Sequence, residues 1–353
     1  MDYKTTLEKL VQEVINQNAS DLHISEGIQP TIRINGDLVP LSSYEIVTND
    51  SAKGLLSVMI NEKFQQEFKE KSELDFSYEH ASGHRFRGNA FVQQGKVGVV
   101  MRLIPKLIKR FDELNLPPIL ATFARKKQGF FLVVGPVGQG KSTTLAAMID
   151  MINEERAEHI ITIENPIEYV YEQKNSIVDQ REVRIDTKDF QSALHGTFRQ
   201  DVDVILVGEM RGGDTISAAV TAAETGHLVF STLHTNTASQ TIDRIIDSFP
   251  SNQQDQIRVQ LAGSLLGVFS QRLIPRISGG MIPAYELLIN NSAVQNLIRE
   301  SRTHEIDTVI ETGTEHGMID MNRTLADLVR RGEITAENAL LHSFRPEMLE
   351  RLM

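Results

Sequence analysis

The chain has 353 residues, of which 41% are hydrophobic and 24% charged, enough for about two domains with separate cores. Its formal net charge of −11 argues against nucleic acid as the main partner. The absence of cysteine excludes disulfides, a thiol nucleophile and a cysteine-ligated zinc, and fits a reducing cytosol. No apolar run approaches the ~20 residues that span a bilayer, so we expect no transmembrane segment and any membrane role through a partner.

Residues 1–104 are predicted to form a small α+β domain. An amphipathic helix opens it, because apolar residues recur at helical spacing: Leu7, Leu10, Val11, Val14 and Ile15. Asn35-Gly36 between two alternating runs predicts a tight hairpin. A helical stretch from Thr48 to Lys71 precedes a second β-rich segment that turns near Gln94-Gly95. Residues 105–118, bounded by prolines, are the expected linker.

Residues 119–353 are predicted to form an α/β domain. Short apolar runs such as FFLVV, HIITIE, VDVILVG and LVFSTLH alternate with helical patterns, which is typical of a largely parallel sheet covered on both faces. Beyond Arg276 the pattern becomes mostly helical. An apolar helix face in this C-terminal region, expected to pack as a lid over the domain, consists of Met321, Leu325, Leu328 and Val329.

FLVVGPVGQGKSTTL, residues 131–145, carries the strongest motif. A strand, a glycine-rich turn with the spacing of a P-loop, and a helix follow each other in the required order. Glycines let backbone N–H groups cradle phosphates, Lys141 supplies a positive charge, and the Ser142 hydroxyl can ligate Mg²⁺. The sequence therefore predicts an ATP site formed by Gly135, Pro136, Val137, Gly138, Gln139, Gly140, Lys141, Ser142 and Thr143.

Acidic and histidine side chains follow several predicted strands. Glu209 is a candidate for the metal site, and Glu164 or Glu168 for orienting the attacking water. His234 also ends a strand and is a candidate sensor of the γ-phosphate, whereas His227 precedes that strand. The alternative for the acids is a solvated strand end, and for the histidines a structural hydrogen bond.

Arginines of the first domain form a second candidate group. Arg85 and Arg87 share one face of a predicted strand, and Arg102 lies in the segment expected to pair with it. A solvated polar face is one interpretation. The other is that these guanidinium groups reach a neighbouring subunit's nucleotide, as arginine fingers do.

Together these segments resemble the secretion-ATPase superfamily, and in particular the PilT-type retraction ATPases of bacterial type IV pili. The resemblance covers nearly the whole chain. Its blocks are SDLHISEGIQPTIRINGDL, the Walker A segment GPVGQGKSTTLAAMID, the Asp box TIENPIE, the Walker B segment VILVGEMRG, the His box GHLVFSTLHTN, and the C-terminal segments IDSFPSNQQDQIRVQLAGSL, AVQNLIRE and HGMIDMNRTLADLVRRGEIT.

The resemblance implies a PAS-like first domain, a RecA-like ATPase domain with a helical C-terminal part, and a homohexameric ring. It implies a motor at the cytoplasmic face of the inner membrane that hydrolyses ATP with Mg²⁺ to retract pili in twitching motility. An inner-membrane platform protein is its expected partner, linking it indirectly to the pilus machinery. Matching positions in the family's motifs assign catalytic roles to Glu164, Glu209, His227, His234, Arg87 and Arg102.

Five positions depart from the family pattern. Asn165 and Gly212 replace aspartates, Gln295 replaces an arginine, and Val137 and Gln139 replace the common threonine and serine of the loop. Because the groups most needed for hydrolysis are present, we expect an active enzyme. The alternatives are a related extension, secretion or translocating ring ATPase, and a weakly hydrolysing regulatory paralogue. The extra N-terminal domain and four-cysteine insert usual in extension and secretion ATPases are not found in this sequence.

Overall fold

A computed structural model describes residues 2–210 and 212–353, and the chain divides into two compact units. Unit 1 extends to Leu107 and also includes Pro166–Tyr169, which the sequence interpretation assigned to the second domain. Unit 2 contains Ile108–Asn165 and Val170–Met353. The first boundary between the units falls within the segment 105–118, which contains no helix or strand.

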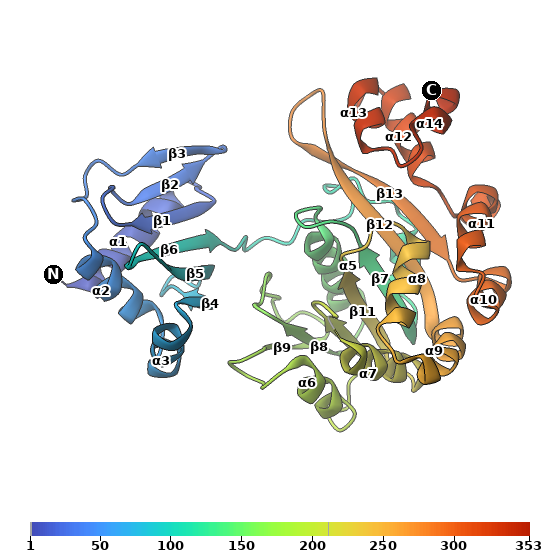
Figure 1. The fold of residues 1–353 in the computed structure, drawn as a ribbon, viewed down its shortest axis with the longest axis horizontal. Coiled ribbons are helices and arrows are strands. Elements are labelled where there is room, and N and C mark those ends of the chain that lie inside the picture. The colour runs from blue at the N-terminus through green and yellow to red at the C-terminus, as the bar shows by residue number, and fades with distance from the viewer. Residues whose placement is uncertain (1, 211) are drawn as a thin grey trace. The chain divides into compact units, whose positions relative to one another are not determined.

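Unit 1 combines helices with one antiparallel sheet (Figure 1). Its elements are α1 (Tyr3–Asn16), β1 (Asp21–Ser25), β2 (Thr31–Ile34), β3 (Asp37–Pro40), α2 (Asn49–Met59), α3 (Glu62–Lys71), β4 (Glu73–Glu79), β5 (Arg85–Gln93) and β6 (Lys96–Leu103). The six strands lie in the order β3-β2-β1-β6-β5-β4, with every neighbouring pair antiparallel. Apolar side chains from one sheet face and from the helices form a single core.

The predicted opening helix and both predicted turns of unit 1 are confirmed. The apolar stripe of α1 is buried at Leu7, Leu10, Val11 and Val14. Asn35 and Gly36 have φ values of 50° and 96° and join β2 to β3, and Gln94 and Gly95, at 50° and 76°, join β5 to β6. Positive φ at both central residues matches the twist of the flanking strands, which is why these dipeptides form the turns.

The single helical stretch predicted from Thr48 to Lys71 is wrong, because the structure divides it into α2 and α3. Ile60 adopts an extended conformation that ends α2. The side chain of Asn61 then accepts a hydrogen bond from the backbone N–H of Phe64 at 3.0 Å and caps α3. An asparagine N-cap satisfies one of the unpaired donors of a new helix, so it favours a fresh start over continuation.

Unit 2 is a mixed α/β unit. Its elements are α4 (Leu120–Ala124), β7 (Gly129–Val134), α5 (Lys141–Glu155), β8 (His159–Glu164), β9 (Ile177–Glu182), α6 (Phe190–Thr197), β10 (Val204–Val207), α7 (Gly213–Glu224), β11 (Leu228–Leu233), α8 (Ala238–Asp247), α9 (Ser251–Ser264), β12 (Leu265–Pro275), β13 (Met281–Ile289), α10 (Ser292–Arg299), η1 (Thr303–Glu305), α11 (Ile306–Thr312), η2 (Gly313–His316), α12 (Met321–Arg330), α13 (Ala336–His342) and α14 (Pro346–Leu352).

The seven strands of unit 2 lie in the order β13-β12-β7-β11-β10-β8-β9. All neighbours are parallel except β12 and β13. Every residue of β7, β10 and β11 is buried, because helices cover both faces of the sheet (Figure 1). On one face Phe131 contacts the rings of Phe123 and Phe230, while Phe130 and Leu132 belong to the core shared with α7, α8 and α9. The predicted, largely parallel sheet is confirmed.

The prediction of mostly helical structure beyond Arg276 holds only partly. β13 lies in this region and pairs antiparallel with β12 along its whole length. Helices α10 to α14 follow, and the predicted apolar face of α12 packs, with Met321, Leu325 and Leu328 buried, against Ile274 and Ile282 of the β12–β13 hairpin. Within residues 2–210 and 212–353 we find no helix with the length and apolar character needed to cross a membrane.

Candidate functional site

The phosphate-binding loop lies between the end of β7 and the start of α5, as the motif predicts. Gly135, Gly138 and Gly140 have φ values of 145°, 77° and 78°, a region that other residues rarely adopt. A Cβ atom at Gly135 would also lie 2.4 Å from the carbonyl oxygen of Gln271. Glycine is therefore required by the backbone path, which leads into a helix amino terminus where N–H groups attract anions.

Lys141, the first residue of α5, has a side chain that turns back over the loop. Its Nζ donates to the carbonyl oxygens of Gly135 at 2.9 Å and Pro136 at 2.8 Å. Nδ1 of His234, at the end of β11, lies 3.3 Å from the same Nζ. The lysine is buried at 7% exposure, whereas Val137 projects from the loop tip at 80%. The loop thus holds a fixed positive charge in its concavity.

One side chain and one backbone N–H of strand β12, which no motif indicated, hold the other side of the loop. Nε2 of Gln271 donates to the carbonyl oxygen of Gln139 at 2.9 Å. Oε1 of Gln139 in turn accepts from the backbone N–H of Leu273 at 2.7 Å. Sequence reasoning missed Gln271 because its partners lie more than a hundred positions away, so no local pattern reveals the pairing.

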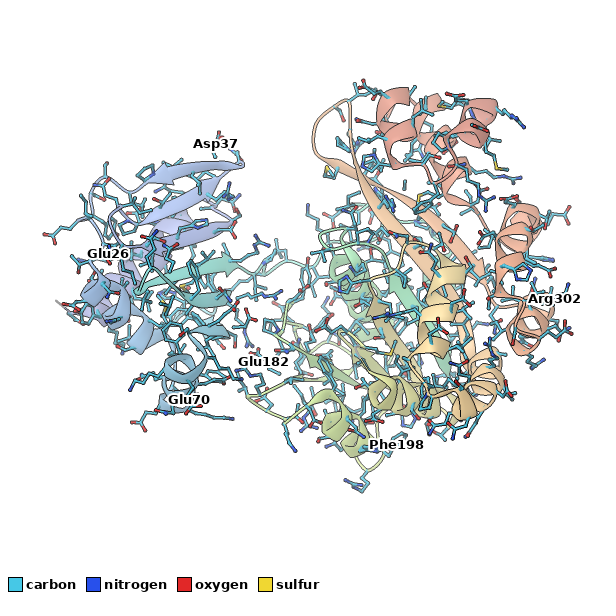
Figure 2. All side chains as sticks on the ribbon, viewed as in Figure 1. Glu26, Asp37, Glu70, Glu182, Phe198 and Arg302 are labelled. Atoms are coloured by element: carbon cyan, nitrogen blue, oxygen red, sulfur yellow. The ribbon has the colours of Figure 1, made fainter. Side chains whose placement is uncertain are left out.

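Two acidic residues end strands at the same edge of the sheet. The carboxylate of Glu164 is buried at the end of β8 and accepts from Thr162 Oγ1 at 2.7 Å and from Gln180 Nε2 at 3.4 Å. Glu182 ends β9 in register with Glu164, and Figure 2 labels it at that strand end. Glu209 follows β10 after Gly208. The edge therefore gathers carboxylates beside a positively charged loop.

Glu209 and His234 line one cavity of about 840 Å³. Arg244 and Asp247, near the end of α8, line the same cavity, although no sequence motif singled them out. Gly212 lies there too, at the N-cap of α7, where it provides no side-chain cap. Arg211 of the Walker B-like segment lies outside the described residues.

The structure does not bring His227 to this edge. It immediately precedes β11, and its carbonyl oxygen accepts from the N–H of Gly129 at the start of β7. Its Nδ1 lies 3.0 Å from the carbonyl oxygen of Ala222, and its ring meets that of Phe198 edge-on with centroids 5.6 Å apart. His227 and His234 thus lie at opposite ends of one strand. The contacts of His227 are those expected if this histidine has a structural role, which is the alternative given in the sequence analysis.

The arginine candidates belong to unit 1. Arg87 and Arg102 are directly opposite each other on β5 and β6, so both lie on one face of the sheet. Arg102 Nε donates to Asp21 Oδ1 at 2.8 Å, and Arg87 Nη1 lies 3.6 Å from Glu168 Oε1. Burial opposes ionisation of Asp21, but hydrogen bonds from Ser20 and Arg102 outweigh it and lower its pKa. Each of the two adjacent guanidinium groups is thus balanced by a carboxylate, Arg102 by Asp21 and Arg87 by Glu168.

The donors near the loop fit Mg²⁺ shared with phosphate. Ser142 contributes a hydroxyl in the first turn of α5, and Glu209 a carboxylate at the strand edge. Mg²⁺ in nucleotide sites takes one or two protein oxygens and otherwise water and phosphate oxygens. Over the described ranges no three or more histidine and acidic side chains converge as an all-protein cage.

Comparisons with known proteins agree with this arrangement. Residues 3–281 match the type II/IV secretion system protein family. The type IV pilus retraction ATPase PilT of Pseudomonas aeruginosa is 44% identical over 336 residues, covering 94% of this chain and 96% of that protein. A twitching motility protein of Neisseria gonorrhoeae is 45% identical over 311 residues, covering 88% and 83%. The crystal structure of the pilus retraction motor PilT with bound ADP aligns with a TM-score of 0.90 at 46% identity, covering 98% of each chain.

Proposed function

The chain belongs to the type II/IV secretion system protein family, and we propose that it is an ATPase that drives the retraction of type IV pili in twitching motility. The observation that carries this proposal is the P-loop of unit 2, with Lys141 Nζ 3.3 Å from His234 Nδ1. Sequence identity of 44–46% to retraction ATPases along nearly the whole chain supports pilus retraction as the process that ATP hydrolysis drives.

Each residue at the loop has a role in binding ATP. Backbone N–H groups of residues 135 and 137–143 receive the phosphates, since Pro136 has none to donate, and Lys141 exchanges its contacts with loop carbonyls for the β- and γ-phosphate oxygens. Ser142 and Glu209 would hold Mg²⁺, which supplies charge neutralisation on those phosphates when bound. His234 would respond to the γ-phosphate, a role supported by its contact with Lys141.

Hydrolysis requires a water aligned with the γ-phosphate. Glu164 is the proposed group that orients and deprotonates this water. Its carboxylate is fixed by Thr162 and Gln180, so it presents a defined oxygen instead of rotating freely. Glu209 lies at the adjacent strand end. We assign His227 a structural role at the base of β11, because its contacts are with Ala222 and Phe198.

Further proposals concern assembly. We propose that residues 1–104 form the PAS-like domain and residues 119–353 the RecA-like ATPase domain, and that six subunits form a ring at the cytoplasmic face of the inner membrane. Arg87 and Arg102 would complete a nucleotide site within that ring, since they present two guanidinium groups side by side that could exchange their carboxylate partners for phosphate. The ring would act on a membrane-embedded platform protein and so on the pilus machinery.

Phosphate release by purified protein tests the proposal. Lys141→Ala should lower the rate by about a hundredfold or more, as loss of a preorganised charge at transferring phosphate does. Glu209→Gln should also remove most activity. Lys127→Ala is the matched control, because that lysine pairs with Glu158 on the surface with 83% exposure, and it should leave the rate unchanged. Near-normal release by Lys141→Ala would overturn the assignment of the site.

A further inference from the structure

Strand β12 continues past the point where its partner β7 ends. The last register pair between them is Ser270 with Val134. The following residues of β12 run beside the phosphate loop, where the carbonyl oxygen of Gln271 closely approaches Gly135. One wall of the loop is therefore a strand from a distant region of the chain.

The side chain of Gln271 joins the loop to the helix that follows it. It is buried at 3% exposure. Its Nε2 donates to the Gln139 carbonyl at 2.9 Å, and its Oε1 accepts from Thr144 Oγ1, in the first turns of α5, at 2.6 Å. A carbonyl can only accept, so the amide has one orientation that satisfies both neighbours.

Gln139 completes the link from the opposite direction. Its Oε1 accepts from the backbone N–H of Leu273 at 2.7 Å. Two glutamine side chains, one on the loop and one on β12, thus cross-connect the two segments with three hydrogen bonds in total, counting the one from Thr144. A serine at position 139 has a shorter side chain, so this contact depends on the glutamine in this sequence.

We infer that Gln139 and Gln271, here called the glutamine clamp, are positioning residues that hold the loop in its phosphate-binding shape. The inference rests on the proposed ATP site. Backbone N–H groups bind phosphate well only when their directions are fixed beforehand, and a loop that must be ordered on binding loses affinity. The clamp therefore sets nucleotide affinity without touching the reacting atoms.

The test measures Kd for ADP together with KM and kcat for ATP. Gln271→Met keeps side-chain length but removes both hydrogen bonds, and should weaken ADP binding about tenfold, which corresponds to 1.4 kcal/mol. Gln139→Met should weaken it severalfold. For both, KM for ATP should rise while kcat changes less than threefold. Gln253→Met, at an exposed position of α9, is the matched control and should behave as the wild type.

A pH-dependent rescue separates positioning from a general structural effect. In Gln271→Glu the ionised carboxylate cannot donate to the Gln139 carbonyl, but the protonated acid can. Because position 271 is buried, the pKa of this carboxyl should rise above its usual range, so ADP affinity relative to the wild type at the same pH should be low at pH 8 and recover at pH 6. Affinities within twofold of wild type in all clamp variants would overturn the inference. The inference would also be overturned if KM rose and kcat fell to a similar extent and ADP affinity did not recover at pH 6. If the wild type itself neither binds ADP nor hydrolyses ATP, that result contradicts the proposed function, and the inference that rests on it falls as well.

Discussion

Lys141 and His234 are 93 positions apart in the sequence, yet their side-chain nitrogens lie 3.3 Å apart. The reason is the register of the parallel strands β7 and β11. It places Val134 beside Leu233, so the two segments that carry Lys141 and His234 leave the sheet at the same level. An ammonium group can only donate, so Nδ1 of His234 accepts in this contact. If a γ-phosphate draws Lys141 away, this nitrogen loses its partner, which is the basis of the sensor role proposed for His234.

Glu286 on β13 is the residue for which the structure predicts a pH effect. Burial raises its pKa to about 7 from the usual 4.5, although its carboxylate accepts from the N–H of Ala238 at 2.8 Å. Asp307 and Asp320 raise the pKa further, and Arg345 opposes them. Because the folded state binds this proton more tightly, its stabilising contribution is complete below pH 4.5 and is lost as pH rises through 7.

The Glu286→Gln variant keeps an acceptor for Ala238 but cannot titrate. The free energy of unfolding of the wild type should fall by roughly 1 to 2 kcal/mol more than that of the variant between pH 6 and pH 8.5. Urea denaturation of both proteins at the two pH values measures the difference. Equal pH dependence in the two proteins would show that this carboxyl does not titrate in that range.

Among elements, α12 supplies the clearest stability prediction. Leu325 is fully buried between this helix and the β12–β13 hairpin, in the cluster that contains Ile274 and Ile282. Leu325→Ala should lower the free energy of unfolding by about 2–5 kcal/mol, since it removes apolar contacts and leaves a cavity. Leu341→Ala on α13, at 77% exposure, is the control and should change it little. Denaturant titration measures the free energy of unfolding of each protein. Similar values for the two variants would contradict the packing described for Leu325.

Local signals account for the elements that the sequence predicted. The stripe of α1 and the Asn35-Gly36 turn depend on neighbours within a few residues, so periodicity and turn chemistry suffice. β12 and β13 lack such signals. Both are covered on both faces and mix polar residues such as Gln271 with apolar ones, so neither shows alternation. Their pairing is a tertiary contact.

The candidate site also contains residues that local sequence signals predict and residues that only tertiary contacts bring in. The phosphate loop follows from its motif, and Glu209 and His234 follow from the rule that parallel strands end at one edge. The contact of Gln271 with Gln139 spans 132 positions and no motif marks it. His227 precedes β11, as the sequence indicates, and its catalytic role stays a prediction that rests on the family motif alone.

At the scale of the whole molecule, the role proposed for Arg87 can be tested by mixing subunits. If Arg87 acts on the nucleotide of an adjacent subunit, mixing Arg87→Ala chains with Lys141→Ala chains should restore some of the hydrolysis that each homogeneous preparation lacks. The reason is that some mixed interfaces pair an intact arginine with an intact phosphate loop. Phosphate release from mixtures with verified subunit exchange measures this. No recovery in such mixtures would place Arg87 outside any shared site.

The direction of work is the central claim, and imaging of pili in living cells tests it most directly. Cells that lack this protein, and cells that carry only Lys141→Ala, should display pili that extend but do not shorten, often in excess. Restoring the wild-type chain should restore shortening, and Lys127→Ala should do so equally well. Cells that lose surface pili altogether after deletion, with normal levels of pilin, would contradict the account and identify an assembly motor instead.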